Sequence, residues 1–140
     1  MASIFTKIID GEAPGRFVWK DTVCVALLSI APLRPGHTLV IPRKAVDHWL
    51  DLDDRTMAHL IQVAKTIGRA QMHAFKPVKI GLMIAGLEVR HVHLHVTPIN
   101  EIVDMDFARQ DPNATAPDLD SSAEKIRQSL RAMGCTEVAG

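Results

Sequence analysis

The sequence predicts an α+β fold, with an antiparallel sheet, one long central helix and a C-terminal helix. Three observations predict it. Short apolar segments separated by proline and glycine turns come first, and a long stretch with helical spacing follows. Two further apolar segments then precede a second helical pattern. This order of strands, helix, strands and helix favours antiparallel pairing over a parallel sheet.

The first part of the chain is predicted to form strands. Residues 4–10 are a short segment of mixed character that ends at Gly11, and Pro14-Gly15 forms a turn. A rigid turn that contains Pro35-Gly36 separates the later strands. We expect strands at residues 17–20, 23–30 and 37–42, of which the second is apolar enough to be buried.

The central helix is predicted over residues 51–74. Asp53 or Asp54 can cap its start, and Lys76-Pro77 ends it, because the residue before a proline disfavours helical backbone. Apolar residues with helical spacing form its buried stripe: Met57, Leu60, Ile61, Ala64, Ile67 and Ala70.

The last part of the chain is predicted to contain two strands, a loop and a helix. Strands are expected at residues 79–85 and 89–97, and a loop rich in proline and aspartate at 99–118. The helix is expected at 121–133, with a capping box at its start and Gly134 as its stop. Its narrow apolar stripe predicts a position on the surface: Ala123, Ile126, Leu130 and Met133.

Composition limits the function classes. The chain has 140 residues, of which 47% are hydrophobic, and 16 basic residues balance 16 acidic ones. We therefore expect one domain and no nucleic-acid or membrane partner. The apolar runs are too short to cross a bilayer, and charges at Lys7, Asp10 and Glu12 argue against a signal peptide. Two cysteines make no disulfide framework, so we expect a cytoplasmic setting.

Three alternating histidines are the most informative motif. On a strand, His91, His93 and His95 would share one face, and the intervening valines and leucine would share the other. Such a row can chelate a metal or supply a nucleophile with neighbours that orient it. It can also be an exposed strand face that happens to carry histidines. The additional candidate metal donors lack a spacing that supports any of them: His37, His48, His59 and Glu88.

The residues 91–97, His-Val-His-Leu-His-Val-Thr, resemble the signature of the histidine triad (HIT) family. Two further segments resemble the same family, namely the opening residues 4–14 and the Pro-Gly-His strand at 35–42. Ala85-Gly86 also precedes the triad at the usual offset. These matches occur in order over about two-thirds of the chain, and they imply a HIT-like fold.

The resemblance implies a nucleotide hydrolase or nucleotidyl transferase that acts at the α-phosphate of a nucleoside phosphate derivative, most simply a purine one. By resemblance His93 is the nucleophile, and a covalent nucleotidyl-histidine forms. His95 and His91 would contact the phosphate oxygens and hold the ring of the nucleophile, and His95 would pass a proton to the leaving group. No cofactor and no metal are implied.

The resemblance also implies a base-binding slot, a domain division and a homodimer. Phe5 and Ile30 are the favoured base contacts, although every slot position is also a natural core residue. The remaining nucleotide-binding candidates are Ile4, Ile8, Leu27 and, at the ribose position, Ser29. Residues 1–108 would form the HIT-like nucleotide-binding domain, and 109–140 a loop and helix that extend it. The dimer would bring the long helices and sheet edges together.

Five departures from the family pattern put the substrate in question. Ser3 and Thr6 replace paired cysteines, which argues against a structural zinc, and Ala45 replaces a histidine for which His48 is a weak substitute. Ser29 replaces an acidic residue. The polar pair before the triad is Leu87-Glu88, where the carboxylate would repel a phosphate, and the loop at 84–86 is shortened.

These departures leave three functions open: an enzyme working through His93, a catalytically impaired nucleotide-binding or scaffold protein, and a metal-dependent hydrolase. Asp106-Phe107 resembles the dinucleoside polyphosphate branch of the family, and the opening segment the phosphoramidase branch. The sequence does not decide between these leaving groups.

Overall fold

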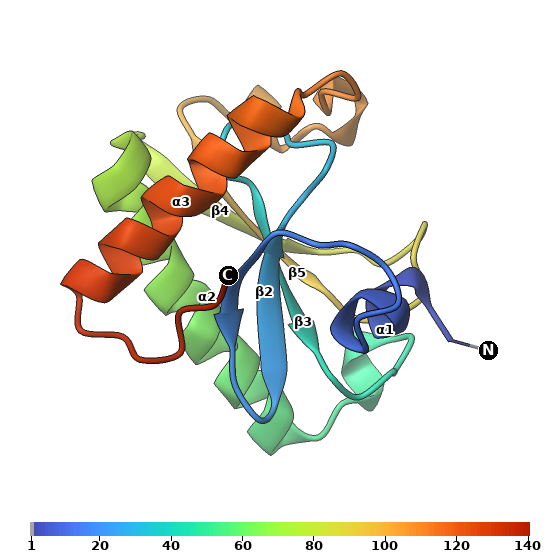
Figure 1. Ribbon diagram of the computed structural model, residues 1–140. Coiled ribbons are helices and arrows are strands. Elements are labelled where there is room, and N and C mark those ends of the chain that lie inside the picture. Colours follow the sequence, from blue (N-terminus) through green and yellow to red (C-terminus); the bar gives the residue numbers. More distant parts are fainter. Residues whose placement is uncertain (1) are drawn as a thin grey trace.

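A computed structural model describes residues 2–140, and over this range it confirms the predicted α+β class. An antiparallel sheet has the strand order β1-β2-β3-β5-β4. The long helix α2 (Asp54–Phe75) and the C-terminal helix α3 (Ala116–Ala132) cover one face of it (Figure 1). The strands are β1 (Phe17–Lys20), β2 (Cys24–Leu28), β3 (Thr38–Pro42), β4 (Lys79–Ile84) and β5 (Leu94–Ile99).

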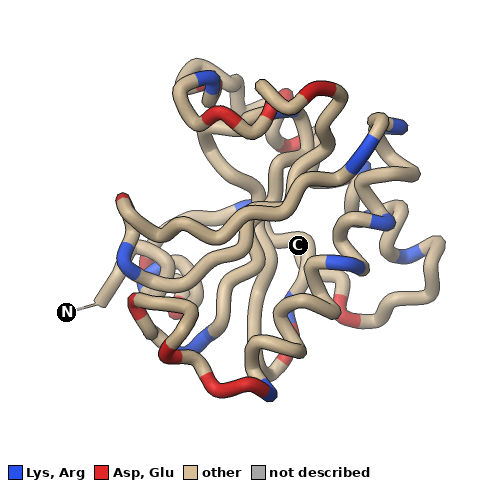
Figure 2. Tube along the Cα trace, turned by 180° about the vertical axis from the view of Figure 1, so that it is seen from behind, with Lys and Arg blue, Asp and Glu red and all other residues tan. Residues whose placement is uncertain are grey.

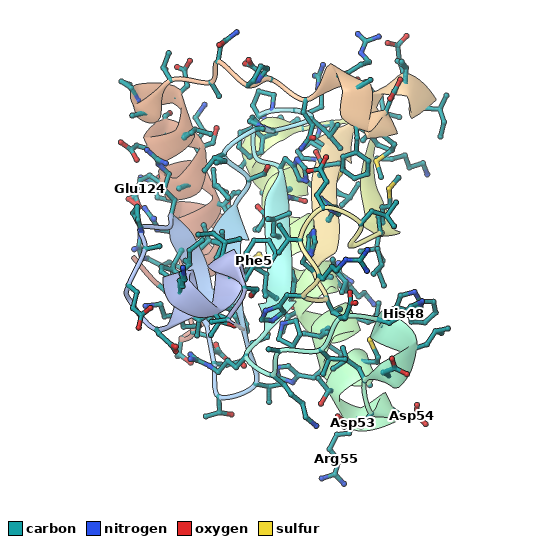
Figure 3. All side chains as sticks on the ribbon, turned by 90° about the vertical axis from the view of Figure 1, so that its right-hand side faces the viewer. Phe5, His48, Asp53, Asp54, Arg55 and Glu124 are labelled. Carbon is teal, nitrogen blue, oxygen red and sulfur yellow. The ribbon has the colours of Figure 1, made fainter. Side chains whose placement is uncertain are left out.

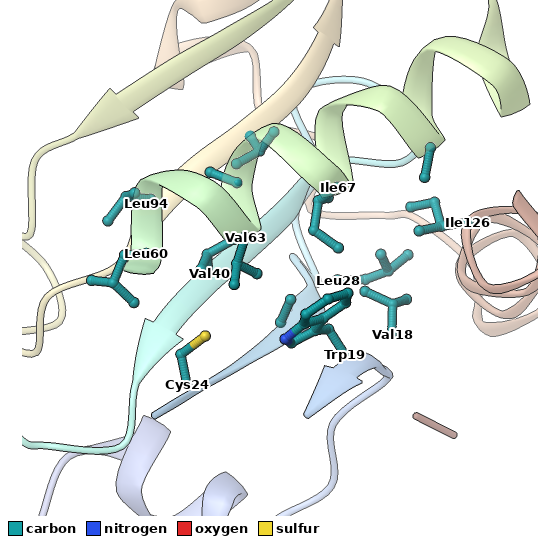
Figure 4. Close-up of a cluster of buried hydrophobic side chains, with 14 of the residues drawn as sticks. Val18, Trp19, Cys24, Leu28, Val40, Leu60, Val63, Ile67, Leu94 and Ile126 are labelled. Atoms are coloured by element: carbon teal, nitrogen blue, oxygen red, sulfur yellow. The ribbon is translucent and has the colours of Figure 1, made fainter. Parts of the chain in front are cut away.

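Alternation along the central strands separates two apolar clusters. Ala26, Leu28 and Val40 point toward α2 and α3 and join the larger cluster (Figure 4). Their neighbours Leu27 and Leu39 point to the opposite face, where they meet side chains of the short helix α1 (Ile4–Ile9). The sheet is therefore covered on both faces at its centre, and the residues 4–10 that the sequence left as a mixed segment form a helix capped by the Ser3 hydroxyl.

Helix α2 begins later than predicted. Asp53 caps it by accepting a hydrogen bond from the Thr56 backbone N–H at 3.0 Å. Trp49–Asp51, just before this cap, instead form a 3-10 helix whose cap is His48. The ring of His48 accepts a hydrogen bond from Leu50 N–H at 3.1 Å, so His48 is a helix-start residue. Figure 3 places His48 and Asp53 together, away from Phe5.

The predicted loop at 99–118 and the predicted start of the last helix are both wrong. Two 3-10 helices occupy Ile102–Met105 and Phe107–Arg109, and α3 begins at Ala116. The Thr115 hydroxyl caps α3, so the anticipated cap at Ser121 lies inside the helix. The earlier start adds a turn and brings further apolar surface into the core.

Helix α3 also contributes more to the core than its narrow stripe suggested. Ile126 and Leu130 are fully buried in the larger cluster between α3, α2 and the sheet, and Leu119 is buried two turns before Ile126. Met133, predicted to lie on this stripe, is 37% exposed because the helix ends there and Gly134 takes a left-handed conformation.

Charge is dispersed around an uncharged centre. Basic and acidic residues are interspersed along the trace (Figure 2), and β2, β3 and β5 contain neither kind. Within residues 2–140, no helix is long and apolar enough to cross a membrane.

Candidate active site

The three alternating histidines precede and enter β5. The predicted strand 89–97 is corrected to Leu94–Ile99. Residues 91–93 do not pair regularly with a neighbouring strand, and the Val92 backbone N–H instead donates to the Val46 carbonyl. The predicted alternation is nevertheless present. Val92, Leu94 and Val96 lie in the α2-side core, whereas the histidine rings gather on the other face.

A row of rings crosses the site. The Phe5 ring of α1 packs edge-on against His91 and His93, with centroids 5.8 and 4.9 Å away. His93 is 4.8 Å from His95, and His95 is 4.8 Å from Phe107. Figure 3 shows Phe5 between α1 and the sheet. The opening segment and the residues that follow β5 therefore hold the two ends of the histidine row.

The hydrogen bonds assign the tautomer of His93. Its Nδ1 lies 2.7 Å from the His91 backbone carbonyl oxygen. A carbonyl can only accept, so His93 Nδ1 carries the proton and donates it. In the neutral ring the lone pair is then on Nε2, the nitrogen that remains for chemistry.

His37 and His95 form a directed chain. The Leu33 backbone N–H donates to His37 Nδ1 at 3.0 Å, so the proton of neutral His37 is on Nε2. His37 Nε2 lies 2.9 Å from His95 Nδ1 and donates to it. Neutral His95 must therefore carry its own proton on Nε2, where it is available as a donor.

His91 faces the interior. It is fully buried, and its Nε2 donates to the Pro42 carbonyl oxygen at 2.8 Å. Its Nδ1 then accepts a hydrogen bond from the Ser3 hydroxyl at 2.7 Å. Both ring nitrogens are occupied within the protein, so His91 is placed to hold the carbonyl that orients His93 rather than to touch a phosphate.

Burial keeps the cluster neutral. Burial, together with smaller effects of the neighbouring His37 and His93, lowers the pKa of His95 to about 3. Burial, with a smaller effect of His93, lowers the pKa of His37 to about 4. Burial also lowers the pKa of His93, although the bond to the His91 carbonyl opposes this. At neutral pH the assigned tautomers therefore persist.

A cavity of about 250 Å³ opens beside His93 and His95. Its other walls come from the segment before β5 and from the residues that follow it: Ala85, Gly86, Leu87, Glu88, Val89, Phe107 and Gln110. His91 and the predicted base-slot residues are not among them. The cavity therefore offers a place for a reacting group next to His93 Nε2.

The predicted nucleotide-binding residues divide into two groups. Phe5, Ile8 and Leu27 are buried together in the α1-side cluster, and Phe5 alone touches the histidine row. Ile4 and Ile30 are 47% and 76% exposed. Ser29 is buried, and its hydroxyl accepts a hydrogen bond from the Ala31 N–H, which closes a turn.

A separate hollow lies at the end of the α1-side cluster. Its walls include three of the predicted base-slot residues, Ile8, Leu27 and Ile30, and the ion pair between Arg16 and Asp120. The structure thus brings Ile8, Leu27 and Ile30 to one hollow, and it places none of the predicted slot residues in the cavity of His93.

Sequence reasoning missed three residues of the site. It named His37 as part of a motif and as a possible metal donor, whereas the position of the ring beside His95 makes it the partner of that histidine. Phe107 and Gln110 lie in the region predicted as a loop. The resemblance of Asp106-Phe107 to one branch of the family was the sequence signal for part of this segment. Gln110 stands in no helical or strand pattern of apolar residues that could have identified it.

A zinc ion does not fit at the opening segment. The Ser3 hydroxyl lies 3.2 Å from that of Thr6 and 2.7 Å from His91 Nδ1, and these groups satisfy one another. Neutral hydroxyls are not the ligands that zinc sites use. Within residues 2–140, donor atoms of three metal-ligating side chains converge elsewhere, at Asp21, Cys24 and His59, and not on the histidine face.

The comparisons with known proteins agree with the family resemblance of the sequence. The HIT domain family profile matches residues 10–102. A HIT-like protein of Borreliella burgdorferi is 38% identical over 102 residues, covering 68% of this chain and 73% of its own length. The adenosine 5'-monophosphoramidase hnt1 of Schizosaccharomyces pombe is 31% identical over 99 residues, covering 70% of this chain and 74% of its own.

Solved structures give the same picture. A zinc-bound histidine triad family protein from Mycobacterium smegmatis is 28% identical with a TM-score of 0.81, and 96% of each chain is covered. A histidine triad nucleotide-binding protein from Sulfolobus tokodaii is 28% identical with a TM-score of 0.80, and 93% of each chain is covered.

Proposed function

Because the chain belongs to the HIT domain family, we propose that it is a nucleotide hydrolase or nucleotidyl transferase that acts at the α-phosphate through a covalent intermediate on His93. The observation that carries this proposal is the pair of opposite tautomers in the cluster. His93 presents a lone pair on Nε2, and His95 presents a proton on Nε2, beside one cavity.

In the first step His93 Nε2 attacks phosphorus, and the bond from phosphorus to the leaving group breaks. The leaving atom takes the electron pair and receives the proton of His95 Nε2 as a proton from solvent replaces it, so the His95 ring remains neutral. The His91 carbonyl stabilises the cationic ring of His93, because it keeps accepting the proton on Nδ1. His37 acts as a positioning residue, because it holds His95 in the donating tautomer.

In the second step water or another acceptor attacks phosphorus and displaces His93. The attacking group releases its proton to solvent as it bonds to phosphorus, and His93 leaves as a neutral ring with its lone pair on Nε2. Hydrolysis and transfer differ only in the acceptor, so the same residues support both reactions.

A nucleoside phosphoramidate is the first substrate class to test. The Schizosaccharomyces pombe relative is an adenosine 5'-monophosphoramidase. We propose that the base lies on the α1 side near Phe5, Ile8 and Leu27, with the exposed Ile30 at its edge, since Phe5 contacts the histidine row and packs in one cluster with Ile8 and Leu27. Ser29 would not hold the ribose as an acidic residue does, because its hydroxyl closes a turn.

A homodimer would cover an apolar surface beside the edge strand β4. Ile61 and Met72 of α2 and Leu82 of β4 are 42%, 41% and 49% exposed, and they line one groove of about 360 Å³. Exposed apolar side chains along an edge strand suit pairing with a second copy. Leu60, on the same helix, is fully buried within its own subunit and would not take part in this interface.

A non-catalytic nucleotide-binding or scaffold protein is the second candidate. The altered positions Ala45, Ser29 and Leu87 favour it, because they lack the histidine, acidic and polar side chains of the family pattern. This candidate predicts tight mononucleotide binding without turnover.

One experiment separates the two. The protein is mixed with adenosine phosphoramidate, quenched in base and analysed by mass spectrometry for an adenylyl group bonded to His93. We expect the adduct in the wild type and its loss in His93→Ala, with turnover reduced at least about a thousandfold. Unchanged turnover in His93→Ala would refute the proposed nucleophile, and binding without any turnover in the wild type would favour the scaffold.

A further inference from the structure

The cavity beside His93 has an unusual charge for a site that handles phosphate. Among the described residues that line it, Glu88 is the charged side chain at neutral pH, and no lysine or arginine takes part. The nearby Arg90 is directed to Asp47, with 3.4 Å between guanidinium nitrogen and carboxylate oxygen. A phosphate chain in this cavity would therefore meet a carboxylate and no compensating cation.

The remaining polar groups of the cavity wall are mainly acceptors. Gln110 donates one N–H of its side-chain amide to the Ala31 carbonyl at 2.9 Å, which leaves its amide oxygen as an acceptor and its second N–H as a donor. The other walls are apolar: Ala85, Leu87, Val89 and Phe107. A carboxylate and an amide oxygen above an apolar surface suit an alkyl chain that ends in an ammonium group.

The wall is held in place by contacts outside the cavity. Besides the bond from Gln110, the Asp111 backbone N–H donates to the Pro32 carbonyl at 3.0 Å. The same turn supplies the Leu33 N–H that orients His37 and, through it, His95. The segment after β5 is thus fixed to the hydrogen-bond chain of the active site, so its side chains meet the substrate at a defined position.

We propose that Glu88 determines specificity by the charge of the leaving group. This proposal rests on the proposed function. The cavity accepts nucleoside phosphoramidates whose leaving amine has a cationic or neutral group at its far end, and it disfavours anionic leaving groups such as a polyphosphate. The nucleoside lies on the Phe5 side of the histidine row, and the leaving group lies on the side of Glu88, Phe107 and Gln110.

The chemistry is unchanged by this selection. His93 Nε2 forms a bond to phosphorus as the phosphorus–nitrogen bond breaks, and the amine nitrogen keeps the electron pair and takes the proton from His95. Glu88 exchanges no proton or electron. It stabilises a cationic group at the far end of the amine. Its effect is therefore on substrate recognition, which is measured as a difference in kcat/KM between substrates.

The test uses three adenosine phosphoramidates of matched length, with leaving amines 1,4-diaminobutane, butylamine and 4-aminobutyrate. Their free ends are cationic, neutral and anionic at pH 7.5. We expect kcat/KM to fall in that order for the wild type. Because Glu88 is exposed, each step should be about two- to fivefold. Glu88→Gln should flatten the series, and Glu88→Lys should invert it.

Glu12→Gln is the matched control, since it removes the same charge from an exposed residue outside the cavity and should leave the order unchanged. If the His93-dependent reaction proceeds but the order does not respond to Glu88, the specificity proposal is wrong and the proposed function stands. If no phosphoramidate reacts and no adduct forms on His93, the proposed function itself fails.

Discussion

Two clusters in this molecule place a histidine against a different partner. At the cavity, His95 meets His37, and both rings are buried. At the other cluster, between the β1–β2 turn and α2, His59 Nε2 lies 2.7 Å from the Asp21 carboxylate. The same side chain thus has a neutral partner in one place and an anionic partner in the other.

The difference teaches how the environment assigns a histidine its role. Burial next to other histidines lowers the pKa values of His37 and His95 and leaves directed, neutral tautomers beside an open cavity. At the second cluster, burial alone would raise the pKa of Asp21. Hydrogen bonds from Trp19, the Cys24 backbone and His59 outweigh that effect and hold it well below its usual range.

The second cluster is therefore best explained as a structural lock. One oxygen of Asp21 accepts from Trp19 Nε1 and His59 Nε2, and the other accepts the backbone N–H groups of Val23 and Cys24. The ligand atoms of Asp21, Cys24 and His59 are close enough to one another to hold a metal ion. The Asp21 carboxylate, however, is already fully engaged by hydrogen-bond donors of the protein. We expect changes at the first cluster to reduce rate and changes at the second to reduce stability.

The largest effect is expected for His95→Ala. Turnover of an alkylamine phosphoramidate should fall about a hundred- to ten-thousandfold, because the amine loses its proton donor. A 4-nitrophenyl phosphodiester of adenosine, whose leaving group needs no proton, should lose far less. Steady-state rates for the two substrates give the comparison. Equal losses would show that His95 is not the acid.

His37→Ala should reduce both rate and stability. It leaves the Leu33 N–H and His95 Nδ1 without their partner, and each such buried group costs about 1–3 kcal/mol. Urea unfolding measures the stability. If His37 acts as a positioning residue, the alkylamine substrate must lose more activity than the 4-nitrophenyl substrate. A uniform loss would assign His37 a structural role only.

Asp21→Asn tests the lock. It should lower the free energy of unfolding by about 1–3 kcal/mol, because the charged acceptor of several hydrogen bonds is removed. Neither kcat nor the leaving-group order should change. His59→Ala should cost less, about 1 kcal/mol or below, since that ring is partly exposed. Loss of activity without loss of stability in either variant would contradict the division between the clusters.

The pH dependence of stability is expected to be small near neutral pH and to grow as the pH falls. The lowered pKa values of His37 and His95 mean that the unfolded chain protonates first, so stability should decline as pH falls below about 6.5 toward about 4 and 3. The lowered pKa of Asp21 adds a further decline below about pH 4. Urea titrations from pH 8 to 3 test this, and in Asp21→Asn the second decline should be smaller.

Much of the fold was predictable because periodicity reports burial directly. The helical spacing of Leu60, Ala64 and Ile67 placed α2, and alternation around the histidines placed Val92 and Leu94 in the core. The start of α3 was missed because two capping signals compete within six residues. Thr115 with Pro117 in the first turn forms the actual cap, whereas Ser121 and Glu124 only resemble one.

The sequence by itself determined the family pattern, the row of histidines and the identity of His93 as the leading candidate nucleophile. Tertiary structure alone decided the tautomers of His37 and His95. His37, just before β3, bonds to His95, and the Leu33 N–H in the preceding turn bonds to His37. It also turned His91 into the interior and brought Glu88, Phe107 and Gln110 around one cavity. Periodicity reports which face of one element is buried, whereas hydrogen bonds and cavities depend on groups far apart in the chain.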